Sequence, residues 1–294
     1  MIKQFLGCLF VFSLCAQEKP SENLWDYHPL HGGGNVIAIG SADVKPRKSP
    51  ETGDLTFNKG NAFLYFLLPV SRTSYFFPRV EWNAFTMNWD KNPKFHETHF
   101  QYMQFALTFY SIAVEKWRWI LRGDYNIDTK HFSQPKAYGL FSGLIWGNYE
   151  LHRKWHYHIG AYGYTGFEGE TIYPVIGIDF APNKKWFFQA VFPMMYSIEY
   201  IFTKEWRLGL KGRPLKERFR TGSHQPQPRS VFCYSTMGAE INLHYEKFLR
   251  CEFEAFAGYN FGGSFYIKDQ NGHNALYTDV QGAPYVGASL NWGF

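Results

Sequence analysis

Hydrophobic and polar residues alternate with a period of two over long stretches of this 294-residue chain. In residues 117–127 the odd positions carry mainly apolar side chains, and the even positions carry Arg, Ile, Arg, Asp and Asn. Residues 231–243 and 249–261 repeat the pattern. Such alternation is typical of β-strands with two different faces, and these stretches exceed the ~5–6 residues of an ordinary globular strand. The pattern predicts an all-β protein with long strands.

Two kinds of connection separate the alternating stretches. Short polar links contain a lysine and end on an aromatic residue that opens the next stretch, and longer polar links lie between them. The short links are 114–117, 152–155, 183–186, 203–206 and 245–248, and the long ones are 90–98, 129–136, 223–230 and 268–282. Regular exchange of short and long links predicts a series of hairpins in one domain.

Counted in this way, the chain holds fourteen strands. They are expected at residues 34–44, 62–70, 74–88, 98–113, 117–128, 137–151, 155–166, 171–182, 186–193, 196–203, 206–221, 230–244, 248–266 and 284–294. Twelve strands are the alternative, because the pair on either side of Pro193 is short and because Pro78 and Pro174 lie inside expected strands, where a missing N–H is costly.

Long strands with one apolar face are typical of a closed antiparallel barrel in lipid, whereas a soluble sandwich has shorter strands. In hydrocarbon every backbone N–H and C=O must be paired, so the sheet has to close, and ~9–11 tilted residues cross the bilayer. Aromatic residues make up 20% of the chain. Those at the turns are expected to anchor the barrel at the membrane interface. The predicted anchors are Trp117, Trp155, Trp186, Trp206, Phe248 and Trp292.

Charged residues on the other strand faces cannot point into lipid, where Arg or Lys at mid-depth costs roughly 2–4 kcal/mol. They are therefore expected to line a lumen. The predicted lumen-lining residues are Arg118, Arg122, Asp124, Arg207, Lys211, Arg213, Glu240, Arg250, Glu252 and Glu254. We favour a passive pore for small hydrophilic solutes; the alternatives are a closed structural barrel, in which salt bridges and bulky Tyr and Phe fill the lumen, or an outer-membrane lipid hydrolase or protease.

Composition and charge exclude other classes. Disordered chains lack so many aromatic residues, and the mean hydropathy of −0.34 argues against a bundle of membrane helices. A net charge of +5 is too small to predict nucleic-acid binding. Residues 1–16 have the charge, apolar core and small-residue exit of a cleaved signal peptide, with a lipidated Cys15 as the alternative. Residues 17–33 are then a periplasmic segment and residues 34–294 the barrel.

The last ten residues, 285–294, alternate strictly and end on Phe294. Here the chain resembles bacterial outer-membrane β-barrel proteins, and residues 196–208 are similar to hairpins of barrel families without an assigned function. The resemblance implies an outer-membrane location, contact with outer-membrane lipids, and recognition of the last strand by the barrel-insertion machinery through Phe294. It implies no activity and no cofactor, and the oligomeric state stays open.

Candidate chemistry is sparse. The stretch His31-Gly32-Gly33-Gly34 resembles the oxyanion-hole segment of some esterases, but the sequence has no Gly-x-Ser-x-Gly, so a flexible entry to the first strand is favoured. His156 and His158 share a strand face and could bind a metal, although polar filling of the interior is favoured. The loop histidines and serines match no hydrolase spacing, and we expect neither an enzyme, a metal nor a cofactor.

The two cysteines after the signal peptide, Cys233 and Cys251, are expected to be free. A three-residue turn at 245–247 would place Cys251 opposite Ile241, ~27 Å from Cys233 at ~3.4 Å per residue. A disulfide spans only ~4.4–6.8 Å between Cα atoms. The same register sets Glu240 opposite Glu252, and both thiols should face lipid.

Overall fold

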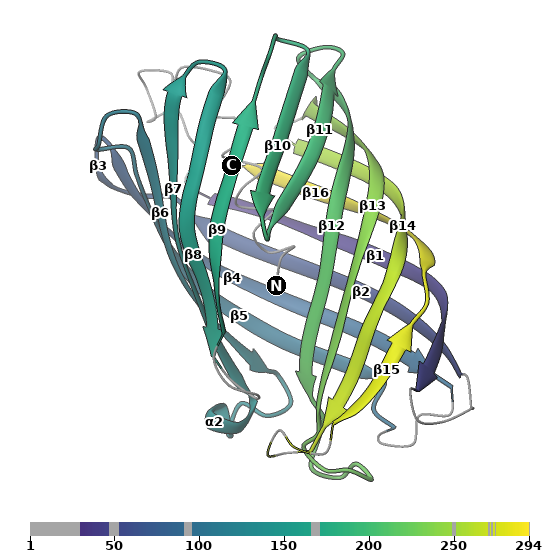
Figure 1. Ribbon diagram of the computed structural model, residues 1–294. Coiled ribbons are helices and arrows are strands. Elements are labelled where there is room, and N and C mark those ends of the chain that lie inside the picture. Colours follow the sequence, from purple (N-terminus) through teal and green to yellow (C-terminus); the bar gives the residue numbers. More distant parts are fainter. Residues whose placement is uncertain are drawn as a thin grey trace.

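The computed structural model describes residues 30–46, 53–90, 96–165, 171–248, 251–269, 271, 273 and 275–293. These residues form one antiparallel sheet that closes on itself (Figure 1). The strands are β1 (Leu30–Pro46), β2 (Gly53–Phe66), β3 (Leu68–Ser71), β4 (Ser74–Trp89), β5 (His99–Ser111), β6 (Trp117–Asp128), β7 (Gly139–His152), β8 (Trp155–Thr165), β9 (Thr171–Phe180), β10 (Trp186–Phe192), β11 (Met195–Ile201), β12 (Trp206–Arg220), β13 (Val231–Phe248), β14 (Cys251–Lys268), β15 (Leu276–Val280) and β16 (Ala283–Gly293).

The sixteen strands occupy fourteen places around the barrel. β3 continues the line of β2 beside β4, while β15 and β16 follow each other in the space between β14 and β1. Pairing of β16 with both β1 and β14, and of β14 with β13, closes the ring. The predicted closed fourteen-strand barrel is therefore confirmed, and the twelve-strand alternative is wrong.

Several strand ends differ from those expected. β1 begins at Leu30 rather than at residue 34, so His31 and the three glycines lie inside the strand and not in a flexible entry. A Cβ on Gly34 would lie 2.5 Å from the carbonyl oxygen of Asn61, so the neighbouring strand leaves no room for a side chain. β2 begins nine residues early, at Gly53, and β15 occupies part of the expected link 268–282.

The register of β13 and β14 is not the expected one. β13 continues to Phe248 and β14 begins at Cys251, so Glu240 pairs with Gly258 instead of Glu252. Glu252 lies opposite Glu246. Backbone pairing continues through two of the three residues expected in a turn, since Tyr245 pairs with Phe253 and Glu246 with Glu252.

The two cysteines are free, as predicted. The expectation that Cys233 faces lipid is wrong, because only 1% of the residue is exposed. This part of β13 lies where the wall folds inward, which covers its outer face. Cys251 is half-buried.

A β-bulge at Gly262 lies where the wall begins to fold inward. Gly262 has a φ of +89°, and its N–H donates to the side-chain oxygen of Asn260 at 3.0 Å. The register between β13 and β14 shifts by one residue there. Because side chains alternate along a strand, the extra residue reverses the parity of the inner face: Asn260 is buried before the bulge, and Phe265 and Ile267 are buried after it.

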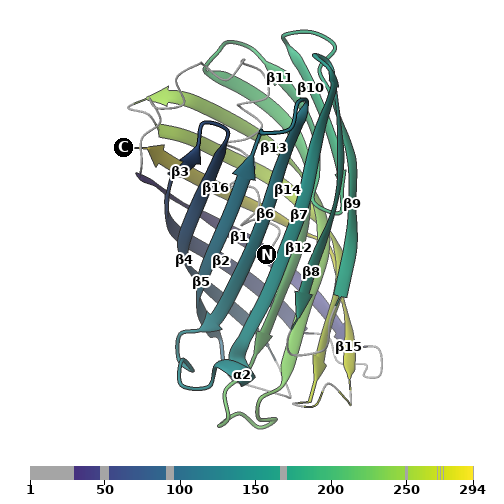
Figure 2. The same ribbon diagram turned by 90° about the vertical axis from the view of Figure 1, so that its left-hand side faces the viewer.

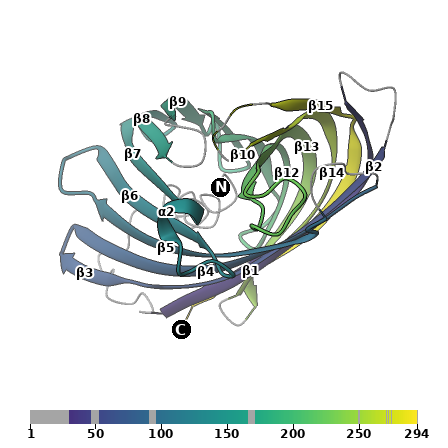
Figure 3. The same cartoon turned by 90° about the horizontal axis from the view of Figure 1, so that it is seen from below.

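The half of the barrel that carries the long connections is flattened rather than round. Inner-face side chains of β12, β13 and β14 pack directly on those of β1, β2, β4 and β5. The ring centroids of Phe57 and Tyr234 are 4.8 Å apart, and those of Phe85 and Phe219 are 4.4 Å apart. Seen from below, the end of the β12–β13 hairpin lies well inside the outline of the barrel (Figure 3).

The long connections gather at one end of the barrel and the short lysine-containing turns at the other (Figures 1 and 2). A short helix, α2 (Pro135–Tyr138), lies in the connection between β6 and β7 at the end with the long loops. Because outer-membrane barrels have short periplasmic turns and longer extracellular loops, we call the end with the short turns periplasmic and the other extracellular. In the described part of the chain, no helix is long and apolar enough to cross a membrane.

Candidate functional site

The charged side chains predicted to line a lumen lie on inner strand faces, where they pair with one another. Arg213 of β12 binds Glu240 of β13 through two nitrogens, and Tyr285 donates to the same carboxylate at 3.0 Å. Lys211 lies 2.9 Å from Glu254. Paired in this way, the charges neutralise each other and leave little net field across the interior.

Most of the remaining predicted charges are paired as well, whereas Glu252 has no ion pair among the described residues and lies opposite Glu246. Arg122 binds Asp124, which also accepts a hydrogen bond from Gln104 at 3.0 Å. Near the periplasmic end the pairs are looser and half-buried, and Arg250 lies outside the described residues. These outer pairs are Arg207 with Glu246 at 3.1 Å and Arg118 with Glu150 at 3.8 Å.

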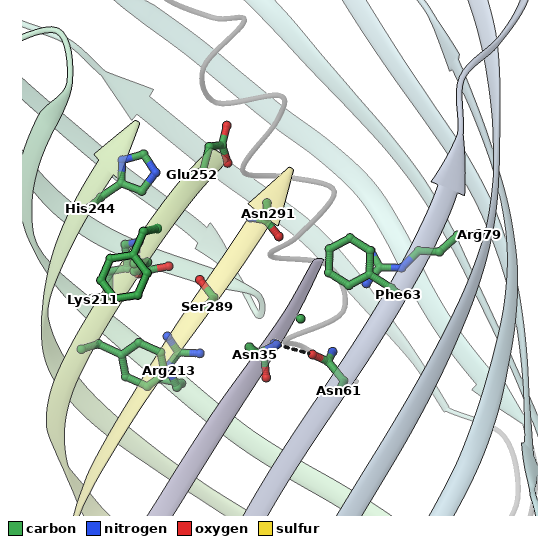
Figure 4. A pocket seen from close by; sticks show the side chains of 14 residues that line it. Asn35, Asn61, Phe63, Arg79, Lys211, Arg213, His244, Glu252, Ser289 and Asn291 are labelled. Carbon is green, nitrogen blue, oxygen red and sulfur yellow. Dashed lines mark hydrogen bonds and ion pairs between the residues drawn. The ribbon is translucent and has the colours of Figure 1, made fainter. Parts of the chain in front are cut away.

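A small polar cavity of ≈ 40 Å³ lies among these groups, between β1, β2, β4, β12, β13, β14 and β16 (Figure 4). Glu252, Lys211 and Arg213 border it on one side. On the other side the backbone N–H of Asn35 donates to the side chain of Asn61 at 2.8 Å. A buried water needs ~10–15 Å³, so this cavity has room for a few waters and for no larger solute.

Halfway to the extracellular end, an ion pair joins opposite walls. The Lys59 ammonium of β2 lies 2.6 Å from the Glu217 carboxylate of β12, and their side chains are 1% and 5% exposed. Tyr102 of β5 donates to the other oxygen of Glu217 at 3.2 Å. Together with the aromatic contacts above it, this pair places side chains across the central lumen.

Hydrogen bonds between three long connections cover the extracellular mouth. The Glu97 carboxylate accepts from the Lys130 ammonium at 2.8 Å and from the backbone N–H of Gly222 at 3.0 Å. The phenol of Tyr138 in α2 donates to the carbonyl of Thr221 at 3.3 Å. Burial raises the pKa of Tyr138, so the phenol keeps the proton that this bond needs. Figure 3 shows α2 and the β12–β13 connection in the middle of this end.

The wall itself is incomplete on one side. β10 and β11 have only seven residues each, fewer than the ~9–11 needed to cross a membrane, so their hairpin ends partway down the wall (Figure 1). β9 pairs with β10 over residues 176–180 and β11 pairs with β12 over residues 207–212. Among the described residues, 171–175 of β9 and 213–220 of β12 have no partner strand on the sides that face each other.

A cavity of ≈ 340 Å³ lies at this break. Its lining is mainly apolar and aromatic. It comes from β5–β9, from the turn between β10 and β11, and from β12 and β13, where residues of both strand faces take part. The residues that line it are Tyr102, Asn126, Ile127, Asp128, Tyr138, Leu140, Tyr162, Tyr164, Tyr173, Phe192, Pro193, Met194, Pro214, Lys216, Glu217, Arg218, Phe219, Arg220, Ser235 and Thr236.

Lys216 reaches across this cavity from β12 to the opposite wall. Its ammonium lies 3.0 Å from the phenol oxygen of Tyr164 and 3.4 Å from that of Tyr173. The guanidinium of Arg218 stacks on the Tyr164 ring, 4.4 Å from its centroid. Phenol oxygens and ring faces therefore hold these cations in place where the sheet is interrupted.

Aromatic rings on the outer surface lie at strand ends beside the short turns. Trp117, Trp155, Trp186 and Trp206 each begin a strand at a short turn, as the sequence predicts. The Trp206 ring contacts that of Tyr245 with centroids 4.5 Å apart. Each of the other three contacts a ring on a neighbouring strand. Phe248 ends β13 instead of opening the next strand, Trp292 lies near the end of β16, and Phe294 is outside the described residues.

His156 and His158 lie side by side on the inner face of β8. The Nε2 atom of His158 lies 2.9 Å from the Asp179 carboxylate, and its Nδ1 accepts a hydrogen bond from the Trp146 indole at 3.0 Å. Both ring nitrogens of His158 are thus engaged by protein groups. The described residues contain no group of three or more His, Cys, Asp or Glu side chains placed to hold a metal ion.

The model of one family, described as a domain of unknown function (DUF6268), matches residues 85–293. The chain belongs to the DUF6268 family. This match covers most of the barrel, from within β4 to the end of β16.

Two relatives of this DUF6268 chain are uncharacterised proteins of chlamydiae. A protein of Chlamydia pneumoniae is 24% identical over 202 residues, which are 68% of this chain and 63% of that protein. A protein of Chlamydia trachomatis is 19% identical over 256 residues, 82% of this chain and 80% of the relative. The chain thus spans a little under two thirds of the first relative and four fifths of the second.

Among solved structures, the DUF6268 barrel is similar to the COG4313 outer membrane channel from Pseudomonas putida F1, with a TM-score of 0.51 and 9% identity over 94% of this chain and 99% of that one. A TodX monoaromatic hydrocarbon channel mutant gives a TM-score of 0.48 and 7% identity over 95% and 94% of the two chains. At these identities the likeness concerns the fold, which is that of bacterial outer-membrane β-barrels. With its closed sheet, exposed apolar side chains and interfacial aromatic rings, this DUF6268 protein is an outer-membrane barrel.

Proposed function

We propose that the protein is an outer-membrane channel for small, mainly apolar solutes and that the aromatic cavity at the break is its binding site. The single observation that carries this proposal is the cavity of ≈ 340 Å³ walled by Tyr162, Tyr164, Tyr173 and Phe192. It falls within the ~300–1,000 Å³ of ordinary ligand pockets. It is roughly twice the ~150 Å³ cavity that holds a benzene molecule, which suggests a solute with two fused rings.

A passive pore for hydrophilic solutes has less support in the interior. Most of the charges that would have to solvate such a solute are already paired, the polar cavity has room for waters alone, and Lys59 with Glu217 joins opposite walls. An apolar solute is stabilised in the aromatic cavity by contact with apolar side chains. A sugar or an ion would lose its hydrogen bonds to water there, and a polar group buried without a hydrogen bond costs free energy.

Initial uptake of radiolabelled naphthalene by bacterial cells that produce the protein would test the proposal, alongside swelling of liposomes containing the purified protein in arabinose. We expect uptake several-fold faster than in cells without the protein, and no swelling. Swelling alone would favour the hydrophilic pore, and neither response would favour a closed structural barrel. Release of fatty acid or peptide from envelope substrates would favour an enzyme.

A filled cavity gives the sharper comparison. Ser235 lines the cavity, so Ser235→Phe places a ring inside it and should reduce naphthalene uptake to the level of cells without the protein. Ala161→Phe is the matched control, because Ala161 is exposed on the outer face of β8. Equal uptake by the two variants would contradict the assignment of the site.

A further inference from the structure

We infer that solutes reach the aromatic cavity sideways, from the outer leaflet of the membrane, through the wall between β9 and β12. This inference rests on the proposed function and adds the route to it. Three observations support it: the interrupted wall, the closure of the other ways in, and the chemistry of the rim.

The interruption is large enough for a small solute. Five residues of β9 and eight of β12 lack a partner on the facing sides, which corresponds to ~16 Å and ~26 Å of strand at ~3.3 Å per residue. With strands tilted by ~35–45°, the shorter edge alone covers ~12 Å of depth, about half of the ~25 Å apolar band of such barrels. Side chains rather than backbone hydrogen bonds hold the two edges together along this height.

Among the described residues, contacts obstruct the ways into the cavity from the extracellular mouth and from the flattened lumen. Toward the extracellular side, Glu97 binds the connections that carry Lys130 and Gly222, and Tyr138 binds Thr221 above the cavity. Toward the flattened lumen, β12 itself forms a wall, and its inner face packs against β2, β4 and β5. Between the cavity and the central lumen lie Tyr102, Glu217 and Phe219, which line the cavity and also contact Lys59 and the aromatic residues of the flattened lumen.

The rim that faces the membrane is apolar. On the outer face of β9, Ile172 is 77% exposed and Ile176 is 63% exposed, and Phe192 at the end of β10 is 49% exposed. Apolar side chains at this level contact acyl chains without cost, and a solute dissolved in those chains meets the same surface. Water-soluble solutes have no such path to the opening.

Lys216 is placed to close the opening. Its bonds to the phenols of Tyr164 and Tyr173 run between β12 and the facing strands β8 and β9, where backbone pairing is interrupted. Hydrogen bonds between a cation and neutral phenols are few and formed by flexible groups, so they can part and re-form as a solute passes. A paired strand could not do this, because its whole ladder would have to break.

A covalent bridge across the opening tests the route. Cys233 and Cys251 are first replaced by alanine, and Tyr173→Cys with Lys216→Cys then places one thiol on each side of the break. After assembly in the outer membrane, a bismaleimide joins the thiols. The control pair is Ile145→Cys with Ala161→Cys, which are exposed, directly opposed residues of the paired strands β7 and β8.

We expect cross-linking at the break to reduce naphthalene uptake at least tenfold, and cross-linking of the control pair to leave it unchanged. Folding is not at issue, because the bridge is formed in the assembled protein and uptake is measured before and after. Uptake that is sensitive to Ser235→Phe but unaffected by the bridge would overturn the lateral route and leave the proposed function standing. Uptake that never exceeds that of cells without the protein would overturn the function itself.

Discussion

The ion pair between Lys59 and Glu217 offers a direct test of whether the lumen is closed. The perturbation is Lys59→Met, which keeps a side chain of similar length and removes the charge. In the folded protein this change leaves the Glu217 carboxylate, whose side chain is 5% exposed, with the Tyr102 phenol but without its ammonium partner at 2.6 Å. The double replacement Lys59→Met with Glu217→Met removes both charges and leaves an apolar contact between the walls.

The structure sets the size of each effect. Removal of one partner from a buried ion pair costs about 3–5 kcal/mol, because the remaining charge is buried without compensation. Replacement of both partners by apolar side chains is close to neutral or stabilising by ~1–4 kcal/mol. An ion pair in contact with water contributes ~0–1 kcal/mol. The single and double variants therefore differ by several kcal/mol if the pair is buried, and hardly differ if water fills the lumen.

Urea unfolding of the protein in lipid vesicles, followed by tryptophan fluorescence, gives the free energies needed. Lys184→Met in the exposed turn between β9 and β10 serves as the control and should change stability by less than ~0.5 kcal/mol. If Lys59→Met cost less than ~1 kcal/mol, the pair would be solvated, and a closed lumen at this depth would be refuted.

Two further predictions concern the wall. Gly262→Ala should lower the free energy of unfolding by at least ~1–2 kcal/mol, because the residue has a φ of +89° and a Cβ would lie 2.6 Å from the carbonyl of Val280; Gly123→Ala, where nothing lies within 4 Å of the added atom, should not destabilise in the same titration. In a double-mutant cycle of Trp206→Ala and Tyr245→Ala, the ring contact should give a coupling of ~0.5–1.5 kcal/mol, and strictly additive losses would exclude a specific pair at the interface.

Much of the wall could be predicted because its physics is local. Alternation along residues 117–127 fixes which side of β6 meets lipid, and a Lys-Trp turn combines a hydrated charge with an interfacial ring in four residues. Registers were less accessible, since a strand can continue through a polar pair such as Glu246 and Lys247 as readily as turn there. Because β13 continues through these residues, Glu240 does not pair with Glu252, and every pairing between β13 and β14 differs from the expected one.

The aromatic cavity could not be predicted from the same pattern. Lys216 and Arg218 occupy positions of β12 whose parity, counted from Leu208 and Leu210, points to lipid. They are tolerated there because this end of the hairpin folds inward, and that fold depends on contacts between distant strands. One local signal did indicate the site: the short hairpin around Pro193, which argued for twelve strands, is the reason that the wall is interrupted.

The sequence also indicates the flattened lumen, because some inward strand faces carry apolar residues where a water-filled pore would need polar ones. Near the extracellular end of β2 the inward residues Leu55 and Phe57 are apolar and buried, whereas Lys59 and Asn61 follow them on the same face. β6 differs, because its inward positions carry Arg, Asp and Asn. Apolar inward residues at this end of β2 are expected to pack on a second layer of strands, because apolar surface is more stable out of water. A water-filled pore would instead need polar inner faces all around the ring, so the uneven distribution of polarity among the strands already favours a barrel flattened on the side of β1–β5.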